Sequence, residues 1–402
     1  MSQKNNMQGY SFLEKILSWK STGKYKVLTI LGCQKKFVSQ KRISKILLNG
    51  VSKIQNEILE TKVLANQNEI LGLCKNISLS MNKLTNKRRM EWQGIVDSSP
   101  SSFKDFILNN SMPEIIKDLK ANLDEKSLQI IDRTLKKIVQ LPDYTYSKYL
   151  YVDDNEFRNR FETEDDKAFN ALHDKYFMVA RTKYKLSKDD YDMEVFVYHH
   201  GLNFAPEKIK KYVKGKDFVD AGAYVGDSAL VFMDYSPHKI YSFEISETSI
   251  QNYQKTMELN SIEKDKWQLV KAALSDKKGT VTVADDGGMS VKVYNSKGDT
   301  VEATDLDAYL ADKNVNIGFI KADLEGGMYK ALIGMEKTIK KYRPVLSFAI
   351  YHSPEEFFYT KPLLDKITKD LNYKITIDCH FSSCFHIYGT VIWAYPRELE
   401  EN

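Results

Sequence analysis

Acidic residues and glycines follow two short apolar runs in the second half of the chain. The first run ends at Asp220 and turns through Gly222 and Gly226, where the lack of a side chain lets backbone N–H groups approach a bulky ligand. The next run ends at Glu244, and a carboxylate at that place can accept both hydroxyls of a ribose. This spacing predicts a nucleotide-type binding site with one glycine fewer than the dinucleotide pattern.

Two later apolar runs also end in side chains that can bind or transfer protons. One is followed by Asp323 and Glu325, and the other by Tyr351 and His352. The carboxyl ends of parallel strands meet at one edge of an open α/β sheet, so we expect these side chains to lie beside the glycine turn. An imidazole titrates near neutral pH, which makes His352 the leading candidate for a general base.

Apolar runs separated by helical stretches predict the sheet that positions these groups. The expected strands are residues 217–221, 239–243, 267–273, 317–322, 345–350, 373–377 and 390–395. The last run follows the sixth after a loop too short for a crossover helix, so we expect the last strand to be antiparallel. Residues 280–283 and 290–293 predict an inserted hairpin. The predicted fold class is therefore α/β.

The order of these residues resembles the FkbM family of S-adenosylmethionine-dependent methyltransferases, in its bacterial surface-glycan branch. The resemblance covers residues 201–402 and implies the class I methyltransferase fold, a Rossmann-like sheet of seven strands with an antiparallel last strand. One departure is Met328-Tyr329, where the family often carries an alanine and then an acid. The motifs that carry the resemblance are Asp220–Gly226, Phe243-Glu244, Asn260, Ala272–Asp276, Thr304–Asp307, Ile320–Gly326 and Pro344–Leu346.

The resemblance implies S-adenosyl-L-methionine as the cofactor and places its contacts on the glycine turn and the strand ends. The implied cofactor-binding residues are Asp220, Gly222, Ala223, Gly226, Asp227, Ser228, Glu244, Ile245, Ala272 and Asp323. The implied substrate-binding residues are His200, Tyr351 and His380. The expected reaction is O-methylation of a sugar hydroxyl of a bacterial surface polysaccharide or of its nucleotide- or lipid-linked precursor.

Two other functions stay open on the sequence alone. A non-catalytic assembly or scaffold protein of a glycan-synthesis complex would keep the cofactor fold only as a vestige. A dinucleotide-dependent oxidoreductase is disfavoured because the glycine turn lacks the third glycine.

Removal of the acceptor proton also has two solutions, because a sugar hydroxyl is a poor acid. In the first, His352 takes the proton, while Asp323 and Glu325 orient the imidazole or take the proton themselves. In the second, the same three side chains hold a divalent ion such as magnesium, which polarises the acceptor. The sequence favours the first solution, and we assign no metal site.

Composition indicates an ordinary globular protein with an uneven charge distribution. The 402 residues have a net charge of +5, and residues 1–50 hold ten Lys or Arg and one acid. Such a basic arm favours contact with an anionic surface, either inner-membrane lipid or a charged substrate, whereas no nucleic-acid-binding module accompanies it. Four cysteines form no dense framework, and no apolar run approaches the length of a membrane span, so we expect a cytoplasmic protein.

The first half of the chain is expected to be accessory. We predict a basic arm over residues 1–40 with a strand or hairpin at 24–32, a long helix within 41–96, and a mainly helical region over 97–200. Apolar residues at a 4-3-4 spacing within 41–90 favour either a short coiled coil that makes a homo-oligomer or packing on the protein's own body. Residues 201–402 are the expected methyltransferase domain.

Overall fold

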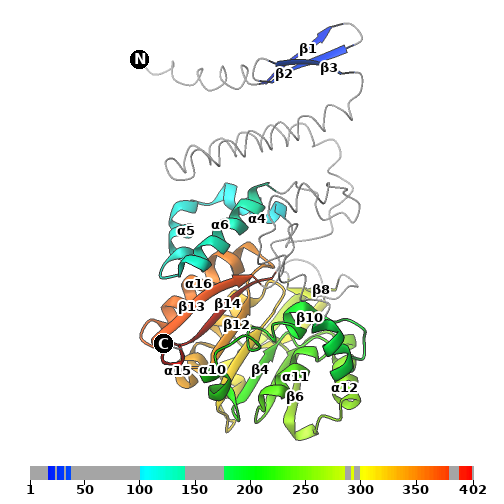
Figure 1. The fold of residues 1–402 in the computed structure, drawn as a ribbon, viewed down its shortest axis with the longest axis vertical. Helices are drawn as coiled ribbons and strands as arrows, with labels where there is room; N and C mark the ends of the chain where they lie inside the picture. Colours follow the sequence, from blue (N-terminus) through cyan, green and yellow to red (C-terminus); the bar gives the residue numbers. More distant parts are fainter. Residues whose placement is uncertain are drawn as a thin grey trace. The chain divides into compact units, whose positions relative to one another are not determined.

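A computed structural model shows how these elements are arranged (Figure 1). It describes residues 17–22, 25–30, 33–37, 100–140, 176–285, 291–293, 299–379 and 389–400. The chain divides into two compact units, residues 1–87 and residues 88–402. The expected helix over 41–90 and the candidate residue His380 lie outside the described residues, so both remain predictions.

The first unit contains a small antiparallel sheet. Its strands are β1 (Leu17–Thr22), β2 (Tyr25–Ile30) and β3 (Cys33–Phe37), with β2 in the middle. Strand β2 falls within the predicted segment 24–32. The connections between these strands are two residues long, as in tight β-hairpins.

The second unit is built on a seven-stranded sheet. Its spatial order is β13-β14-β12-β11-β4-β5-β6. The last strand of the chain, β14, is antiparallel to both of its neighbours, while the other pairs are parallel. This confirms the predicted sheet and its reversed last strand. The strands are β4 (Asp217–Ala221), β5 (Ile240–Glu244), β6 (Trp267–Lys271), β11 (Ile317–Ala322), β12 (Val345–Ala349), β13 (Tyr373–Cys379) and β14 (Thr390–Pro396).

The centre of this sheet is covered on both faces, which explains its uninterrupted apolar strands. Every residue of β4, β11 and β12 is buried. Phe218 of β4, Phe319 of β11 and Phe232 meet with ring centroids 5.3–5.7 Å apart. This aromatic cluster fixes the spacing of the two strands that carry Asp220 and Lys321.

The connecting helices form two groups. Helices α9 (Met193–Phe196), α10 (Glu207–Val213), α11 (Asp227–Phe232) and α12 (Glu247–Leu259) precede β6 in the chain, and α11 contacts both α9 and α12. The later group comprises α13 (Leu306–Leu310), α14 (Met328–Ile333), α15 (Glu336–Tyr342) and α16 (Pro354–Thr368), and α16 contacts α14 and α15.

Three accessory helices pack against α16 and β13, as Figure 1 shows. They are α4 (Pro100–Asn109), α5 (Met112–Lys120) and α6 (Glu125–Gln140). The rings of Phe106 and Phe358 stack at 5.0 Å, and the Ile377 N–H of the edge strand donates a 2.9 Å hydrogen bond to Ser127 Oγ. These helices therefore protect an edge of the sheet that would otherwise expose backbone groups.

The predicted hairpin belongs to a second sheet, whose order is β7-β10-β8-β9. The hairpin strands are β8 (Gly279–Asp285) and β9 (Val291–Val293), which pair antiparallel. Strands β7 (Ala273–Leu274) and β10 (Asp299–Thr304) complete the sheet and were not predicted. Within the described part of the chain, no helix combines the length and apolar character needed to cross a membrane.

Candidate active site

The glycine turn after β4 lies directly against the end of β11. Gly222 has φ +77°, and a Cβ placed on it would lie 1.9 Å from the backbone oxygen of Asp323. The N–H of Gly222 donates to the backbone oxygen of Phe243 at 3.0 Å, which joins the turn to β5 as well. Only glycine fits this position, because any side chain would separate two of the strands that carry candidate residues.

The rest of the turn is held by the helix that follows β5. Gly226 has φ +83°, and a Cβ there would lie 3.0 Å from the ring of Tyr253, whose hydroxyl lies 2.9 Å from Ser242 Oγ. Between the two glycines, Tyr224 has a φ of +43°, a backbone conformation that residues other than glycine rarely adopt. Backbone strain of this kind is concentrated at functional sites.

Glu244 at the end of β5 is fixed by backbone donors. Its carboxylate accepts hydrogen bonds from the N–H groups of Tyr224, Ile245 and Ser246, each at 2.8 Å. Burial raises the pKa of Glu244, although these three hydrogen bonds oppose that shift. Because one of the donors belongs to the glycine turn, Glu244 and the turn form one rigid unit.

Lys321 is a site residue that the sequence analysis named only as part of a motif. Its Nζ lies 3.2 Å from Asp220 Oδ1 and donates a 2.5 Å hydrogen bond to the backbone oxygen of Gly222. Burial alone would lower the pKa of Lys321, but Asp220, Asp323 and Asp227 raise it. The sequence does contain a signal for this role, since Lys321 is the one charged residue in an otherwise apolar strand. A buried charge needs a partner, so such a lysine is expected to pair with a nearby acid.

Asp220 and Asp227 are buried carboxyl groups beside this lysine. No described residue donates a well-aligned hydrogen bond to either side-chain oxygen of Asp220, whose ion pair with Lys321 is its main compensation. Burial raises the pKa of Asp227 to about 7, and its Oδ1 accepts a 2.8 Å hydrogen bond from the Ser228 N–H. Both carboxyl groups therefore retain capacity to accept hydrogen bonds from a ligand.

Asp323, Glu325 and His352 lie together at the ends of β11 and β12, as predicted. His352 Nε2 is 3.1 Å from Asp323 Oδ1 and 3.8 Å from Glu325 Oε1. The imidazole is buried, whereas the Asp323 and Glu325 side chains are about a third exposed, at 31% and 30%. Glu325 has φ +47°, a second strained backbone position in the site.

Glu356 holds this cluster in place and was not predicted as a site residue. It is fully buried, and its Oε2 lies 3.1 Å from His352 Nδ1 and accepts the His352 backbone N–H at 3.2 Å. Its Oε1 accepts the N–H groups of Gly326 and Met328 at 3.0 and 2.9 Å. The sequence signal was Ser353 three residues earlier, a pattern typical of a capping box, and Ser353 Oγ accepts the Glu356 N–H at 3.2 Å.

The carboxylates set the charge of the imidazole. Burial alone would lower the pKa of His352, but Glu325, Asp323 and Glu356 outweigh it and raise that pKa well above its ordinary range. Burial would raise the pKa of Asp323, but His352 and Lys321 hold it well below its usual value. These carboxylates favour the protonated form of His352. In that form the imidazole could not accept a proton, which would leave the role of base to Asp323 or Glu325.

Residues 184–200, which we call the bridging segment, connect helix α12 to the glycine turn. Tyr224 of the turn donates its hydroxyl to Asp190 at 3.0 Å, and Lys188 Nζ lies 2.7 Å from the same hydroxyl. Asn260, a motif residue of the sequence analysis, exchanges hydrogen bonds of 2.9 and 2.7 Å with the Lys185 backbone. Most of this segment is irregular, and its only helix is the short α9, although a mainly helical region is expected over residues 97–200.

His200 at the end of the bridging segment lies beside the cofactor candidates. Its Nε2 is 2.8 Å from Ser228 Oγ, and its Nδ1 is 3.6 Å from Glu194 Oε1. His200 is also one of the groups that lower the pKa of Asp323. The ring of Tyr351 lies 4.1 Å from that of His352, centroid to centroid.

The remaining candidates occupy the expected edge of the sheet. Ala223 lies in the glycine turn and is fully buried, Ile245 directly follows β5, and Ala272 is a buried residue directly after β6. The structure thus brings most of the described candidates to the carboxyl ends of five neighbouring strands, β12, β11, β4, β5 and β6, and to the glycine turn. Ser228 lies in α11 directly after this turn, and His200 lies in the bridging segment. The catalytic and binding roles of all these candidates stay predictions.

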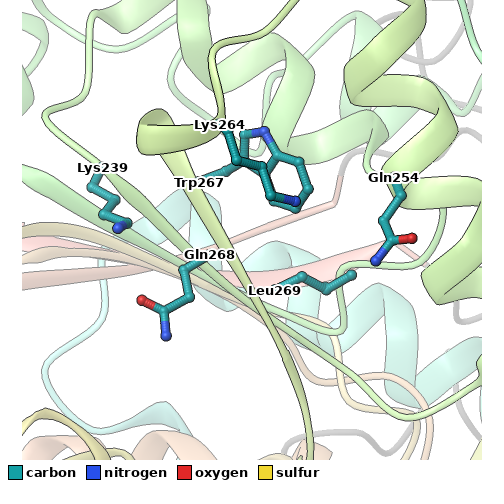
Figure 2. A pocket seen from close by; sticks show the side chains of 6 residues that line it. All are labelled: Lys239, Gln254, Lys264, Trp267, Gln268 and Leu269. Atoms are coloured by element: carbon teal, nitrogen blue, oxygen red, sulfur yellow. The ribbon is translucent and has the colours of Figure 1, made fainter.

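A pocket of about 270 Å³ lies at the opposite edge of the sheet (Figure 2). It is lined by Lys239, Gln254, Lys264, Trp267, Gln268 and Leu269. Lys239 precedes β5 and Trp267 begins β6, so this pocket is at the amino ends of the strands. Ligands of open α/β sheets bind at the carboxyl ends, and we therefore assign the pocket no part in the site.

Comparison with known proteins agrees with this arrangement. Residues 220–375 match the family described as the Methyltransferase FkbM domain. No curated protein matches the sequence.

Among solved structures, the chain is similar to methyltransferase FkbM from Methylobacillus flagellatus, with 14% identity and a TM-score of 0.46 over 72% of this chain and 60% of that one. This chain therefore spans less than two thirds of that protein. It is also similar to an rRNA methylase from Streptococcus thermophilus, with 12% identity and a TM-score of 0.33 over 52% of this chain and 99% of that one. A methyltransferase from Streptococcus mutans in complex with SAH matches with 11% identity and a TM-score of 0.32, over 47% and 93%.

The family match covers the glycine turn, Glu244, Asp323 and His352, which are the groups that the structure brings together. Residues 220–375 of this chain are an FkbM methyltransferase domain.

Proposed function

We propose that the protein is an S-adenosylmethionine-dependent O-methyltransferase that acts on a sugar hydroxyl. The observation that carries the proposal is the joining, within an FkbM methyltransferase domain, of the Glu244-bound glycine turn to the Asp323–Glu325–His352 cluster. One part suits an adenosine ligand, and the other suits an acceptor that must lose a proton. The backbone contact between Gly222 and Asp323 places the two parts next to each other.

The residues of the turn fit S-adenosylmethionine. Glu244 presents a carboxylate at the end of β5, where it can accept ribose hydroxyls, and Ile245 offers an apolar contact to a base. The buried carboxyl groups of Asp220 and Asp227 suit the cationic amino group of a methionine moiety, because Asp220 lacks a well-aligned hydrogen bond from any described residue. Gly222 keeps the turn close to β11.

In the reaction, S-adenosylmethionine supplies a methyl group that is already activated by its sulfonium. The acceptor oxygen bonds to the methyl carbon while the carbon–sulfur bond breaks and its electron pair stays on sulfur. The chain must align the acceptor and take its proton. Asp323 or Glu325 takes that single proton, and the His352 Nε2 atom lies beside both carboxylates and holds them in place.

A sugar suits the acceptor position because carboxylates bind hydroxyl pairs well. The cluster is rich in such acceptors, with Asp323 and Glu325 about a third exposed. The assignment to a bacterial surface polysaccharide or its nucleotide- or lipid-linked precursor comes from the family resemblance of the sequence, which is an argument by analogy.

The test is a transfer assay with methyl-labelled S-adenosylmethionine and a pool of nucleotide sugars. We expect label in a sugar methyl ether, and we expect Asp323→Asn to abolish the incorporation. Label in a protein, a nucleic acid or an amine would contradict the sugar assignment. No incorporation into any acceptor, together with no rise in the melting midpoint when S-adenosylhomocysteine is added, would favour the scaffold alternative instead.

A further inference from the structure

We propose that Asp323, Glu325 and His352 form a site for one divalent metal ion, which binds the acceptor through a pair of neighbouring hydroxyls. From the sequence alone, an ion held by these residues is the less favoured of two solutions, and no metal site is assigned there. The role of the ion toward the acceptor rests on the proposed function, whereas binding of the ion does not.

The three side chains already have the spacing of metal ligands. Each offers one ligand atom, and these atoms all lie within 4.8 Å of one another. His352 Nε2 lies 3.1 Å from Asp323 Oδ1 and 3.8 Å from Glu325 Oε1. Two ligand atoms bound at right angles to one ion, each at about 2.1 Å, are about 3 Å apart. His352 Nε2 and Asp323 Oδ1 already have this spacing, and the Glu325 carboxylate would move toward an ion that takes the place of the Nε2 proton.

Glu356 provides a second and independent observation. Histidines that bind metals almost always donate their other ring N–H to a carboxylate or a carbonyl, which fixes the ring orientation. Glu356 Oε2 lies 3.1 Å from His352 Nδ1, is fully buried, and is itself fixed through Oε1 by the Gly326 and Met328 N–H groups. This arrangement directs Nε2 of His352 at Asp323 and Glu325.

Asp323 provides a third observation. Its Oδ1 atom is buried, and no residue in the described part of the chain donates a well-aligned hydrogen bond to it, although His352 Nε2 is close. The nearby imidazole of His352 offsets the charge of this carboxylate, and the buried oxygen keeps the capacity to bind a further partner. A divalent ion at this point would bind the oxygen directly.

The ligand set indicates which ions fit. Two carboxylates and one imidazole suit Mn²⁺, which accepts both oxygen and nitrogen ligands, and suit Mg²⁺ less well. Three protein ligands leave an octahedral ion with three further positions. Two neighbouring sugar hydroxyls and a water can fill these positions. The ion would lower the pKa of the bound hydroxyl, so that its proton leaves to a carboxylate or to water as its oxygen attacks the methyl carbon.

The test is a Mn²⁺ titration of the full-length protein, in which electron paramagnetic resonance measures the free ion. We expect about one bound ion per chain, and we expect Asp323→Asn to weaken binding at least about tenfold. Glu356→Gln should weaken it about 10- to 100-fold by releasing the imidazole. Glu355→Gln is the matched control, because Glu355 precedes Glu356 in α16 but its side chain is exposed, and it should change nothing.

Two results would overturn the metal site: no stoichiometric Mn²⁺ binding by the wild type, or unchanged binding by Asp323→Asn. If circular dichroism shows that Glu356→Gln is unfolded, Glu325→Gln replaces it, since that side chain is partly exposed. Methyl transfer is measured in parallel with and without a chelator. If methyl transfer is undiminished in the presence of the chelator, the metal has no role in the reaction, but the methyltransferase function stands. If the protein binds Mn²⁺ but transfers no methyl group, the metal site stands and the proposed function is contradicted.

Discussion

At the residue scale, the buried cation Lys321 organises the negative charges of the site. It is 4% exposed and contacts Asp220 and the backbone oxygen of Gly222, so one side chain joins β11 to the glycine turn. Burial of a charge is favourable only when partners compensate for the loss of water. The site therefore depends on Lys321 for its folding as well as for its shape.

Replacement of this lysine tests that dependence. We expect Lys321→Met to lower the free energy of unfolding by about 3–5 kcal/mol, because it leaves Asp220 as a buried charge without its partner. Adding Asp220→Asn to Lys321→Met should restore part of the loss. Urea denaturation of the wild type, both single variants and the double variant measures the coupling. Purely additive effects would show that the ion pair is not the cause.

The glycine turn gives a second prediction at this scale. Gly222→Ala should unfold more readily than Gly215→Ala and should lose affinity for S-adenosylhomocysteine. The two glycines have nearly equal φ, +77° and +75°, but a Cβ at Gly222 meets the Asp323 backbone at 1.9 Å, whereas nothing lies within 4 Å at Gly215. The left-handed backbone alone costs about 1–2 kcal/mol in either variant.

Thermal melting measures the stability of the two glycine variants, and calorimetry measures their affinity for S-adenosylhomocysteine. The comparison separates the cost of a left-handed backbone, which both variants share, from the overlap with the Asp323 backbone, which only Gly222→Ala has. Equal losses in both variants would mean that the backbone contact with Asp323 has no role.

At the element scale, the bridging segment connects the glycine turn to α12. Among the described residues, no strand pairs with the backbone of this segment. Side chains of α12 and of the residue after it form hydrogen bonds with its residues 185 and 187. Segments held in this way are among the first parts of a protein to open locally. The bridging segment carries His200 and contacts Tyr224, so its opening would alter the site.

Asn260→Ala should loosen this segment. The substitution removes hydrogen bonds to the Lys185 N–H and backbone oxygen, worth about 1 kcal/mol each. We expect faster amide hydrogen exchange at residues 185–190 and little change in the strands. Asn252→Ala is the control, because the Asn252 side chain donates its hydrogen bond to the Thr248 backbone oxygen inside α12 and not to the bridging segment. Equal exchange in the two variants would contradict the anchoring role of Asn260.

At the same scale, His199 makes the stability of the protein depend on pH. Burial lowers the pKa of His199 to about 4, and its Nδ1 lies 2.8 Å from the Tyr235 hydroxyl. The folded state therefore resists protonation, and the stabilisation present above the unfolded pKa of about 6.5 is lost as the pH falls toward 4. Each pH unit in this window costs at most about 1.4 kcal/mol.

His199→Asn should lose less stability than the wild type between pH 7.5 and pH 4.5. Asparagine tolerates the φ of +47° at this position, so the backbone is preserved. Urea denaturation at the two pH values measures the difference. An identical loss in both proteins would show that His199 is not the group responsible.

At the scale of the whole molecule, the sheet and the ends of its strands could be predicted because buried parallel strands are continuous apolar runs. Polar residues at the ends of these runs then indicated the candidate site, and in this way Asp220, Glu244, Asp323 and His352 could be predicted to lie near one another. Lys321 and Glu356 were missed as site residues because their roles depend on contacts across the sheet and across a turn. Strand β10 was missed because three of its six residues are exposed and its only buried residue is Ala303.

The central claim is that the carboxyl edge of the sheet binds an adenosine cofactor through Glu244. Calorimetric titration of the full-length protein with S-adenosylhomocysteine tests it most directly. Hydrogen bonds to a charged group are worth about 1.5–3 kcal/mol, so Glu244→Ala should bind about 10- to 100-fold more weakly than the wild type. Lys264→Ala, in the pocket at the opposite edge, should bind normally. The absence of binding by the wild type, or equal affinity in Glu244→Ala, would contradict the account.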